Sequence, residues 1–320
     1  MPHNDDDALP ADPAVIDLPI QGAAPESAGV WRAFRDRYKL TVHMIEDRTG
    51  LTIQARKTRI EFDRKSLHWI WLLSFAGWKA WRLHGPHLFW AWLTDQQIDP
   101  TLRAADPTYG EAEADYESVR YATRDIRDLD SAEDIAWPDN VPRPQPDKAG
   151  FGIEDQAAFD LMTIAFAYML LHEARHVRFN AEKGRPNPAD EETTCDAFAR
   201  DFILGKASRY AVETNQPVEG VVAKRAAGVA LGTFALYDLT PRAGLGGTSD
   251  YPPIADRLAS IYDAIDLPPD SWFWDFAASL LITLVVRQDQ SFAIPDLAGQ
   301  TLCLAMIDVL RAKNENATDA

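Results

Sequence analysis

The sequence predicts an α+β fold, with a small strand-containing N-terminal part followed by a mostly helical part. Apolar and polar residues alternate between positions 39 and 62, which is typical of half-buried strands. Beyond residue 151, long apolar runs alternate with short segments rich in Gly, Pro and Asn, which is typical of packed helices joined by turns. A tryptophan-rich segment between the two patterns also favours a helix.

Composition and periodicity divide the chain into four segments. Residues 1–28 are rich in Asp, Pro and Ala without periodicity, so we expect a disordered acidic tail. Residues 29–150 form the α+β N-terminal region, which ends in a proline-rich loop or linker at 139–148. Residues 151–312 form the helical region, and residues 313–320 are expected to be a second disordered tail.

Three strands are expected at the start of the N-terminal region. Residues 39–55 alternate in polarity around a polar turn at 47–50, a pattern that predicts a hairpin. A third strand is expected at residues 58–62. The charged stretch 111–134 favours a solvated helix.

Residues 66–83 suit a helix that carries Trp71, Trp78 and Trp81 near one face. Most tryptophans of the chain fall between Trp69 and Trp92. One interpretation is an exposed aromatic groove that binds an extended peptide. The favoured interpretation is a core that packs the N-terminal region onto the following helices.

The helical region is expected to hold one helix that ends in a histidine motif and a second that carries Glu192. Four further helices are expected at 218–239, 252–265, 271–286 and 296–312. The first of these four has small residues on one face, which favours close contact with another helix. These small residues are Ala227, Gly228, Ala230, Gly232 and Ala235.

His172, Glu173 and His176 form an HExxH motif at the end of an apolar helical run. Two histidines four residues apart lie on one helix face, where both can bind the same metal ion. The glutamate between them can act as general base on a metal-activated water. A chance occurrence on a surface helix is the alternative, but the preceding apolar run 159–171 predicts a buried helix. Ionisable groups at the edge of a core favour a metal site.

A second acidic helix is expected to complete the metal site, since catalytic zinc takes three protein ligands and one water. Glu192 and Asp196 stand four residues apart, so Glu192 can bind the metal while Asp196 orients a ligand histidine. Glu191 is the competing third ligand, but its partner four residues on is Cys195, a poorer acceptor. Asp190 is expected to cap this helix after Pro188.

The pairing of HExxH with Glu-x-x-x-Asp is the pattern of gluzincin metallopeptidases. Residues 192–199 are similar to the metal motif of ImmA/IrrE-type regulatory peptidases, with Cys195 in place of an alanine. The motif and the acidic Cys-Asp helix together more closely resemble the Lit-type phage-exclusion peptidases. This resemblance covers residues 160–205 and implies a cytoplasmic zinc endopeptidase that acts on a cellular protein in phage defence.

The segment 244–257 contains Thr-Ser-Asp-Tyr-Pro-Pro, followed by Arg257. Several zinc peptidases that this chain resembles have a histidine where Tyr251 stands, in a segment that closes over the site. Tyr251 is therefore a candidate oxyanion donor. The favoured interpretation is a plain helix start with Pro252 and Pro253 in the first turn.

Composition limits the class of partner and the compartment. The net charge of −17 argues against a nucleic-acid partner and is compatible with a protein or peptide substrate. No secretory signal is visible at the N-terminus, and two cysteines give no disulfide framework, so we expect a cytoplasmic protein. The longest charge-free apolar runs have about a dozen residues, which is too short to span a membrane. The sequence leaves the oligomeric state open.

Two other classes of function remain open at this stage. One is a metal-dependent regulatory or sensor protein that acts by protein–protein contact without proteolysis. The other is a helical binding protein in which the histidine motif is accidental and the tryptophan-rich part binds the partner. Zinc content separates the second class from the first, and proteolysis separates the first class from a peptidase.

Overall fold

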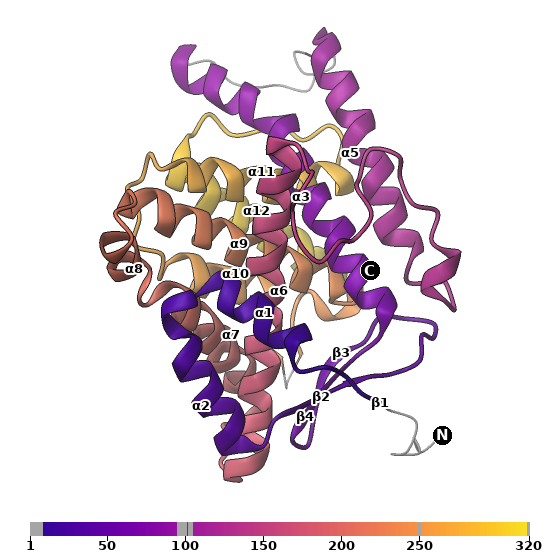
Figure 1. The fold of residues 1–320 in the computed structure, drawn as a ribbon. Helices are drawn as coiled ribbons and strands as arrows, with labels where there is room; N and C mark the ends of the chain where they lie inside the picture. Colours follow the sequence, from indigo (N-terminus) through magenta and orange to yellow (C-terminus); the bar gives the residue numbers. More distant parts are fainter. Residues whose placement is uncertain (1–8, 95–100, 102–104, 249–250, 319–320) are drawn as a thin grey trace.

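The computed structural model describes residues 9–94, 101, 105–248 and 251–318. It is 68% helical with one small sheet in the N-terminal part, which confirms the α+β class. In Figure 1 the strands lie together at one end of the molecule, and the helices of the C-terminal half form the larger body beside them.

All the strands of the described part lie before residue 63, and helices make up most of the rest. The N-terminal half contains β1 (Leu9–Pro10), α1 (Ala14–Ala23), η1 (Pro25–Ser27), α2 (Ala28–Tyr38), β2 (Thr41–Met44), β3 (Ile53–Arg56), β4 (Arg59–Phe62), α3 (Arg64–Thr94), α5 (Pro107–Asp125) and η2 (Ala132–Asp134). The C-terminal half contains α6 (Ile153–Glu182), α7 (Pro188–Leu204), α8 (Ala207–Glu213), α9 (Val218–Leu239), η3 (Arg242–Gly244), α10 (Ile254–Tyr262), α11 (Trp272–Gln288) and α12 (Gly299–Thr318).

The strands are paired in an order that differs from the predicted hairpin. The sheet order is β1-β2-β4-β3, with β2 parallel to β4 and the other pairs antiparallel. The third strand is confirmed, but the hairpin joins β3 to β4 and turns at Lys57, whose φ is 56°. The polar segment at 47–50 does not turn back on itself because its groups bond elsewhere. Asp47 accepts hydrogen bonds from the backbone of Lys65 and Ala132, and Gly50 donates to Arg127.

Both predicted tails are wrong over the residues described. Helix α1 packs on α6, and Ile16 and Ile20 are fully buried. Their spacing of four residues, extended by Ala23, makes an apolar stripe that the acidic and proline-rich composition conceals. At the other end α12 continues to Thr318, and buried Asn314 accepts a hydrogen bond from Tyr237. Residues 1–8, 319 and 320 lie outside the described part.

Helix α6 is central to the core, with α1, α3, α7 and α9 packed against it. It is the one helix in the described part that is long and apolar enough to span a membrane, yet 67% of the apolar window is buried inside the protein. The small face of α9 allows a close approach to α6, as predicted. A Cβ at Gly228 would overlap Ile164, and one at Gly232 would lie 2.6 Å from the Tyr168 ring.

The tryptophan-rich segment forms α3, which packs on α5, α6 and α11. Trp69 and Trp71 are buried, in agreement with the favoured core interpretation, whereas Trp90 and Trp92 are exposed near the end of the helix. One hydrophobic core joins the N-terminal and helical regions, since it includes buried side chains from Ile16 to Leu310. The first region therefore supports the helices that carry the histidine motif.

Candidate metal centre

The histidine motif lies in the last third of α6, and α7 returns beside it. The turn between the two helices begins at Lys183, which has a φ of 52°. Pro188 starts α7, and the Asn187 side chain caps it by accepting a hydrogen bond from the Asp190 backbone at 3.0 Å. The predicted cap at Asp190 is therefore wrong by three residues, since Asp190 already lies in the first turn. Packing of α7 on α6 brings its acidic face to the motif.

Three predicted residues converge through their ligand-capable atoms. The Nε2 atoms of His172 and His176 lie 3.2 Å apart. The Glu192 carboxylate faces both of them, with Oε2 at 3.4 Å from His172 and Oε1 at 3.5 Å from His176. Two imidazole nitrogens and one carboxylate around a common point are a donor set that can bind a transition metal.

The two adjacent glutamates of α7 hold different positions in the structure. Glu191 Oε1 lies 2.8 Å from Nδ1 of His176, on the far side of that ring from Glu192. Asp196 Oδ1 lies 2.9 Å from Nδ1 of His172. Each histidine thus has a carboxylate on Nδ1 that fixes its orientation, and both Nε2 atoms face the common point. Glu191 and Glu192 compete as third ligands in the sequence, but in the structure Glu191 faces Nδ1 of His176 and Glu192 faces both Nε2 atoms.

Asp196 is the most densely bonded group of the site. Arg257, in the first turn of α10, donates from Nε to Oδ2 at 2.7 Å and from Nη2 to Oδ1 at 2.9 Å. The Tyr168 hydroxyl donates to Oδ1 at 2.9 Å. Burial alone would raise the pKa of Asp196, but Arg257 and His172 hold it well below its usual range. The carboxylate is therefore charged and held in place, as an orienting group requires.

Arg257 also contacts Glu192, with Nη1 3.1 Å from Oε2. Burial would raise the pKa of Glu192, but the hydrogen bond to His172 and the charge of Arg257 lower it. Burial alone would lower the pKa of His172, yet Asp196 and Glu192 raise it to about 10. The acidic surroundings thus strongly favour positive charge at the imidazole face, which a divalent cation can supply in place of the proton.

Glu173 lies between α6 and the sheet. Its Oε2 accepts a hydrogen bond from the backbone N–H of Ala55 in β3 at 2.6 Å. Burial raises the pKa of this carboxyl above its ordinary value. A carboxyl group with a raised pKa beside two histidines is suited to accept a proton and to release it again. The fold thus uses the edge strand of the sheet to hold this side chain.

Cys195 provides an alternative third donor. Its Sγ belongs with His172 and His176 to a group whose ligand-capable atoms lie within 4.8 Å of one another. The thiol is fully buried, and burial together with Glu192 raises its pKa well above the ordinary value. A thiol must lose its proton to bind a metal, whereas Glu192 is already ionised and faces both Nε2 atoms. We therefore favour Glu192 as the third ligand.

Tyr251 lies beside the site, in a pocket of about 320 Å³ that Glu192 and Arg257 also line. It is 56% exposed, and its backbone N–H and C=O bond to Thr248 ahead of α10. In the part of the chain that the structure describes, its hydroxyl is not hydrogen-bonded to either histidine. The structure thus brings Tyr251 to the rim of the site while the other predicted residues meet at its centre.

Sequence reasoning missed three contributors to this centre. Arg257 follows Tyr251 by six residues, and a basic residue on an apolar helix face is the sequence signal of a buried ion pair. Tyr168 lies four residues before His172, so the same helix face could have suggested it. The Ala55 backbone carries no side-chain signal and is visible only in the folded chain.

Comparison with known families places all the side chains of this centre inside one match. The family model for peptidase U49 matches residues 60–277, which run from β4 to α11. The chain belongs to the peptidase U49 family. It is accordingly a peptidase, and its substrate is a protein or peptide. No curated protein and no solved structure gives a match. For a U49 peptidase, the histidine and glutamate cluster of α6 and α7 is the natural candidate active site.

Proposed function

We propose that this U49 peptidase is a zinc-dependent endopeptidase. His172, His176 and Glu192 would hold the metal, and Glu173 would act as general base. The observation that carries the proposal is the convergence of two Nε2 atoms and one carboxylate at separations of 3.2 to 3.5 Å. Ligands about 2.0–2.1 Å from a tetrahedral zinc ion lie about 3.3 Å from one another, so the three groups fit zinc with little movement.

The carboxylates on the two Nδ1 atoms further support this assignment. Asp196 and Glu191 each favour the tautomer that carries the proton on Nδ1, which leaves the Nε2 lone pair free to bind a metal. Bound zinc would supply a Lewis acid and would lower the pKa of a water molecule toward neutrality. Arg257 would hold the carboxylates of Asp196 and Glu192 in position, since its guanidinium contacts both.

The remaining chemistry falls to residues of the chain. Glu173 would accept a proton from the attacking water and deliver it to the leaving amine. Its hydrogen bond to the Ala55 backbone keeps the carboxylate at the wall of the site. Tyr251, on the rim, would donate a hydrogen bond to the oxyanion of the tetrahedral intermediate.

For the cellular role we propose cleavage of a cytoplasmic protein, in phage defence or stress regulation. The support is the likeness of residues 160–205 to Lit-type phage-exclusion peptidases. The net charge of −17 favours a basic segment in the substrate over a nucleic acid.

Metal content tests the proposal directly. Zinc would be measured by inductively coupled plasma mass spectrometry on the wild-type chain after purification with zinc and without chelators. We expect one zinc per chain, lost in His176→Ala and Glu192→Ala. Glu191→Ala should retain zinc but bind it about 10- to 100-fold more weakly, because it removes only the orienting carboxylate. No bound zinc in the wild type would overturn the proposal.

Two further variants separate the alternatives. Cys195→Ala should keep zinc if Glu192 is the third ligand and lose it if the thiol is. The enzymatic part is tested on a bacterial cytosolic extract. Protein cleavage after addition of the wild-type chain is compared with cleavage after addition of the Glu173→Gln variant. A chain that binds zinc in all the expected variants but cleaves nothing would favour the regulatory or sensor function.

A further inference from the structure

A second cavity, of about 620 Å³, opens on the other face of the segment that follows α9. Five arginines and a single carboxylate line it, and we refer to it as the arginine cavity. The charged lining residues are Arg120, Arg124, Arg127, Arg242, Arg287 and Asp238. Such a concentration of positive charge is unusual in a chain whose net charge is −17. It is distinct from the candidate metal centre, since none of the proposed metal ligands lines it.

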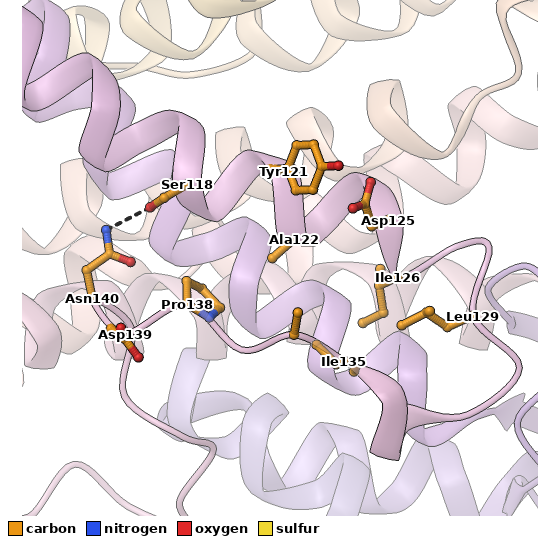
Figure 2. Close-up of a pocket in the computed structure, with 11 residues that line it drawn as sticks. Ser118, Tyr121, Ala122, Asp125, Ile126, Leu129, Ile135, Pro138, Asp139 and Asn140 are labelled. Atoms are coloured by element: carbon orange, nitrogen blue, oxygen red, sulfur yellow. Dashed lines mark hydrogen bonds between the residues drawn. The ribbon is translucent and has the colours of Figure 1, made fainter.

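The arginines come from three separate parts of the chain. Arg120 and Arg124 lie one helical turn apart near the end of α5, and Arg127 lies two residues beyond that end. Arg287 comes from α11 and Arg242 from η3. The neighbouring face of α5 is quite different, since it lines a smaller cavity with Ala122, Ile126 and other apolar residues (Figure 2).

Asp238 neutralises only part of this charge. Its carboxylate accepts hydrogen bonds from Arg120 at 3.0 Å and Arg127 at 2.9 Å, and Arg287 lies 3.8 Å away. The Nε of Arg120 is buried without a hydrogen-bond partner among the described residues. Burial lowers the pKa of Arg287, and repulsion by the positive charge of Arg120 lowers it further.

A purely structural role explains the inner arginines but not the outer ones. Arg120 and Arg127 tie α5 to α9 through Asp238. Arg242 is exposed on η3. Arg124 lies 3.4 Å from Asp125 and stacks over the exposed Tyr121 ring, 4.6 Å from its centroid. Neither outer arginine contributes to the Asp238 cluster. Both nevertheless border the same cavity.

We propose that the arginine cavity binds a small soluble polyanion that carries two or more phosphate groups. Guanidinium groups bind phosphate oxygens through paired hydrogen bonds, and several around one cavity match a ligand with several phosphates. The cavity volume is that of a small-molecule site. An extended nucleic acid would meet the acidic remainder of the surface, which favours a compact ligand.

The arginine cavity adjoins the pocket beside the candidate metal centre. Thr240 and Pro241 line both the arginine cavity and the pocket that contains Glu192 and Arg257. Leu245 lines the arginine cavity, and its carbonyl accepts the Ile254 N–H at the start of α10, the helix that carries Arg257. A bound polyanion would therefore lie next to residues that also line the pocket beside the candidate metal centre.

Isothermal titration calorimetry of the full chain with inorganic tripolyphosphate tests the inference without any need for peptidase activity. We expect saturable binding that weakens as salt rises, and at least about tenfold weaker binding in the double variant Arg124→Gln/Arg242→Gln. The matched control is Arg82→Gln/Arg209→Gln, which removes the same charge from two exposed arginines that pair with Glu154 and Glu213. The control should bind within about twofold of the wild type.

Two results would overturn the inference. One is the absence of saturable tripolyphosphate binding to the wild type, and the other is an equal loss of affinity in both double variants. Titrations with a single-stranded oligonucleotide and with phosphatidylglycerol vesicles identify other phosphate sources. Binding of either one without binding of tripolyphosphate would also overturn the proposal. None of these outcomes depends on whether the metal centre holds zinc.

Discussion

The candidate metal centre and the arginine cavity are charged sites of opposite sign, and the cavity shares Thr240 and Pro241 with the pocket beside that centre. In the metal centre, four carboxylates surround two histidines, and one arginine crosses between Asp196 and Glu192. In the arginine cavity, five arginines and one carboxylate, that of Asp238, line the same space. The first site has an excess of negative charge and suits a divalent cation, whereas the second has an excess of positive charge and suits an anion. Net charge alone would have predicted only the first kind of site.

The two regions also differ in how completely their polar groups are bonded. Asp196 has a donor for each oxygen from His172, Tyr168 or Arg257. In the arginine cavity, Arg120 Nε has no hydrogen-bond partner within the described part of the chain, and Arg242 is exposed. A fully bonded carboxylate is held in one position, as an orienting group must be. Incompletely bonded arginines remain available to a ligand.

The largest expected effect tests the catalytic part of the metal centre. Glu173→Gln removes the general base but keeps the shape of the side chain, so we expect cleavage to fall by about 10²- to 10⁴-fold while zinc content stays unchanged. The measurement is the initial rate of substrate cleavage, with zinc determined on the same sample. Glu182→Gln is the matched control, since this glutamate lies on the same helix and, among the described residues, bonds to Tyr38 and Arg178. Near-normal turnover in Glu173→Gln would reject the base role.

The next effect tests whether Arg257 is needed to bury the carboxylates. Arg257→Met would leave Asp196 and Glu192 without their cation, so we expect the free energy of unfolding to fall by about 3–5 kcal/mol. Urea denaturation measures it. Arg311→Met is the control, because Arg311 pairs with Asp256 and Asp308 near the surface, and a change of about 0–1 kcal/mol is expected. Equal effects of the two substitutions would contradict the importance assigned to Arg257.

Helix α9 connects the two regions, since it packs on α6 and carries Asp238 near its end. Gly228→Ala would press a methyl group into Ile164, so we expect a loss of about 1–3 kcal/mol in stability. Gly29→Ala in α2 is the control, because a Cβ there meets nothing within 4 Å. Gly29→Ala should be neutral or stabilising by up to about 1 kcal/mol. A thermal or urea melt of both variants decides the point.

The smallest effect concerns the pH dependence of the arginine cavity. Burial alone would raise the pKa of Asp238, but Arg120 and Arg127 lower it below its usual range. A lowered folded-state pKa means that the stabilisation is complete above the unfolded-state value of about 4 and is lost as pH falls below it. The difference in unfolding free energy between wild type and Asp238→Asn should therefore shrink below about pH 4. A difference that stays constant from neutral pH to about pH 3 would contradict this cluster.

Much of the local structure was predictable because it depends on neighbours in sequence. Helix α9 matches its predicted bounds, and its small residues indicated the close contact with α6. The i, i+4 spacing of His172 with His176 and of Glu192 with Asp196 indicated two facing helix surfaces. Helix α1 could also have been predicted, because Ile16 and Ile20 have the right spacing, but the acidic and proline-rich composition obscured them.

Strand pairing was not predictable in the same way. Alternation located β2, β3 and β4, but it carries no information about which strand lies between the others. The polar residues at 47–50 could close a hairpin, yet in the folded chain Asp47 bonds to α3 and to the first residue of η2. These competing hydrogen bonds come from residues up to 85 positions away, beyond the reach of any local pattern.

The sequence by itself determined the class of fold, the helices and the set of side chains able to bind a metal, because each follows from spacing along one helix. Only the tertiary structure assigned Glu191 to His176 and brought Arg257 onto Asp196. Only the tertiary structure brings the Ala55 N–H to the Glu173 carboxylate and places five arginines from three separate parts of the chain around one cavity. Those contacts depend on how separate elements pack together, and packing is decided by the whole core at once.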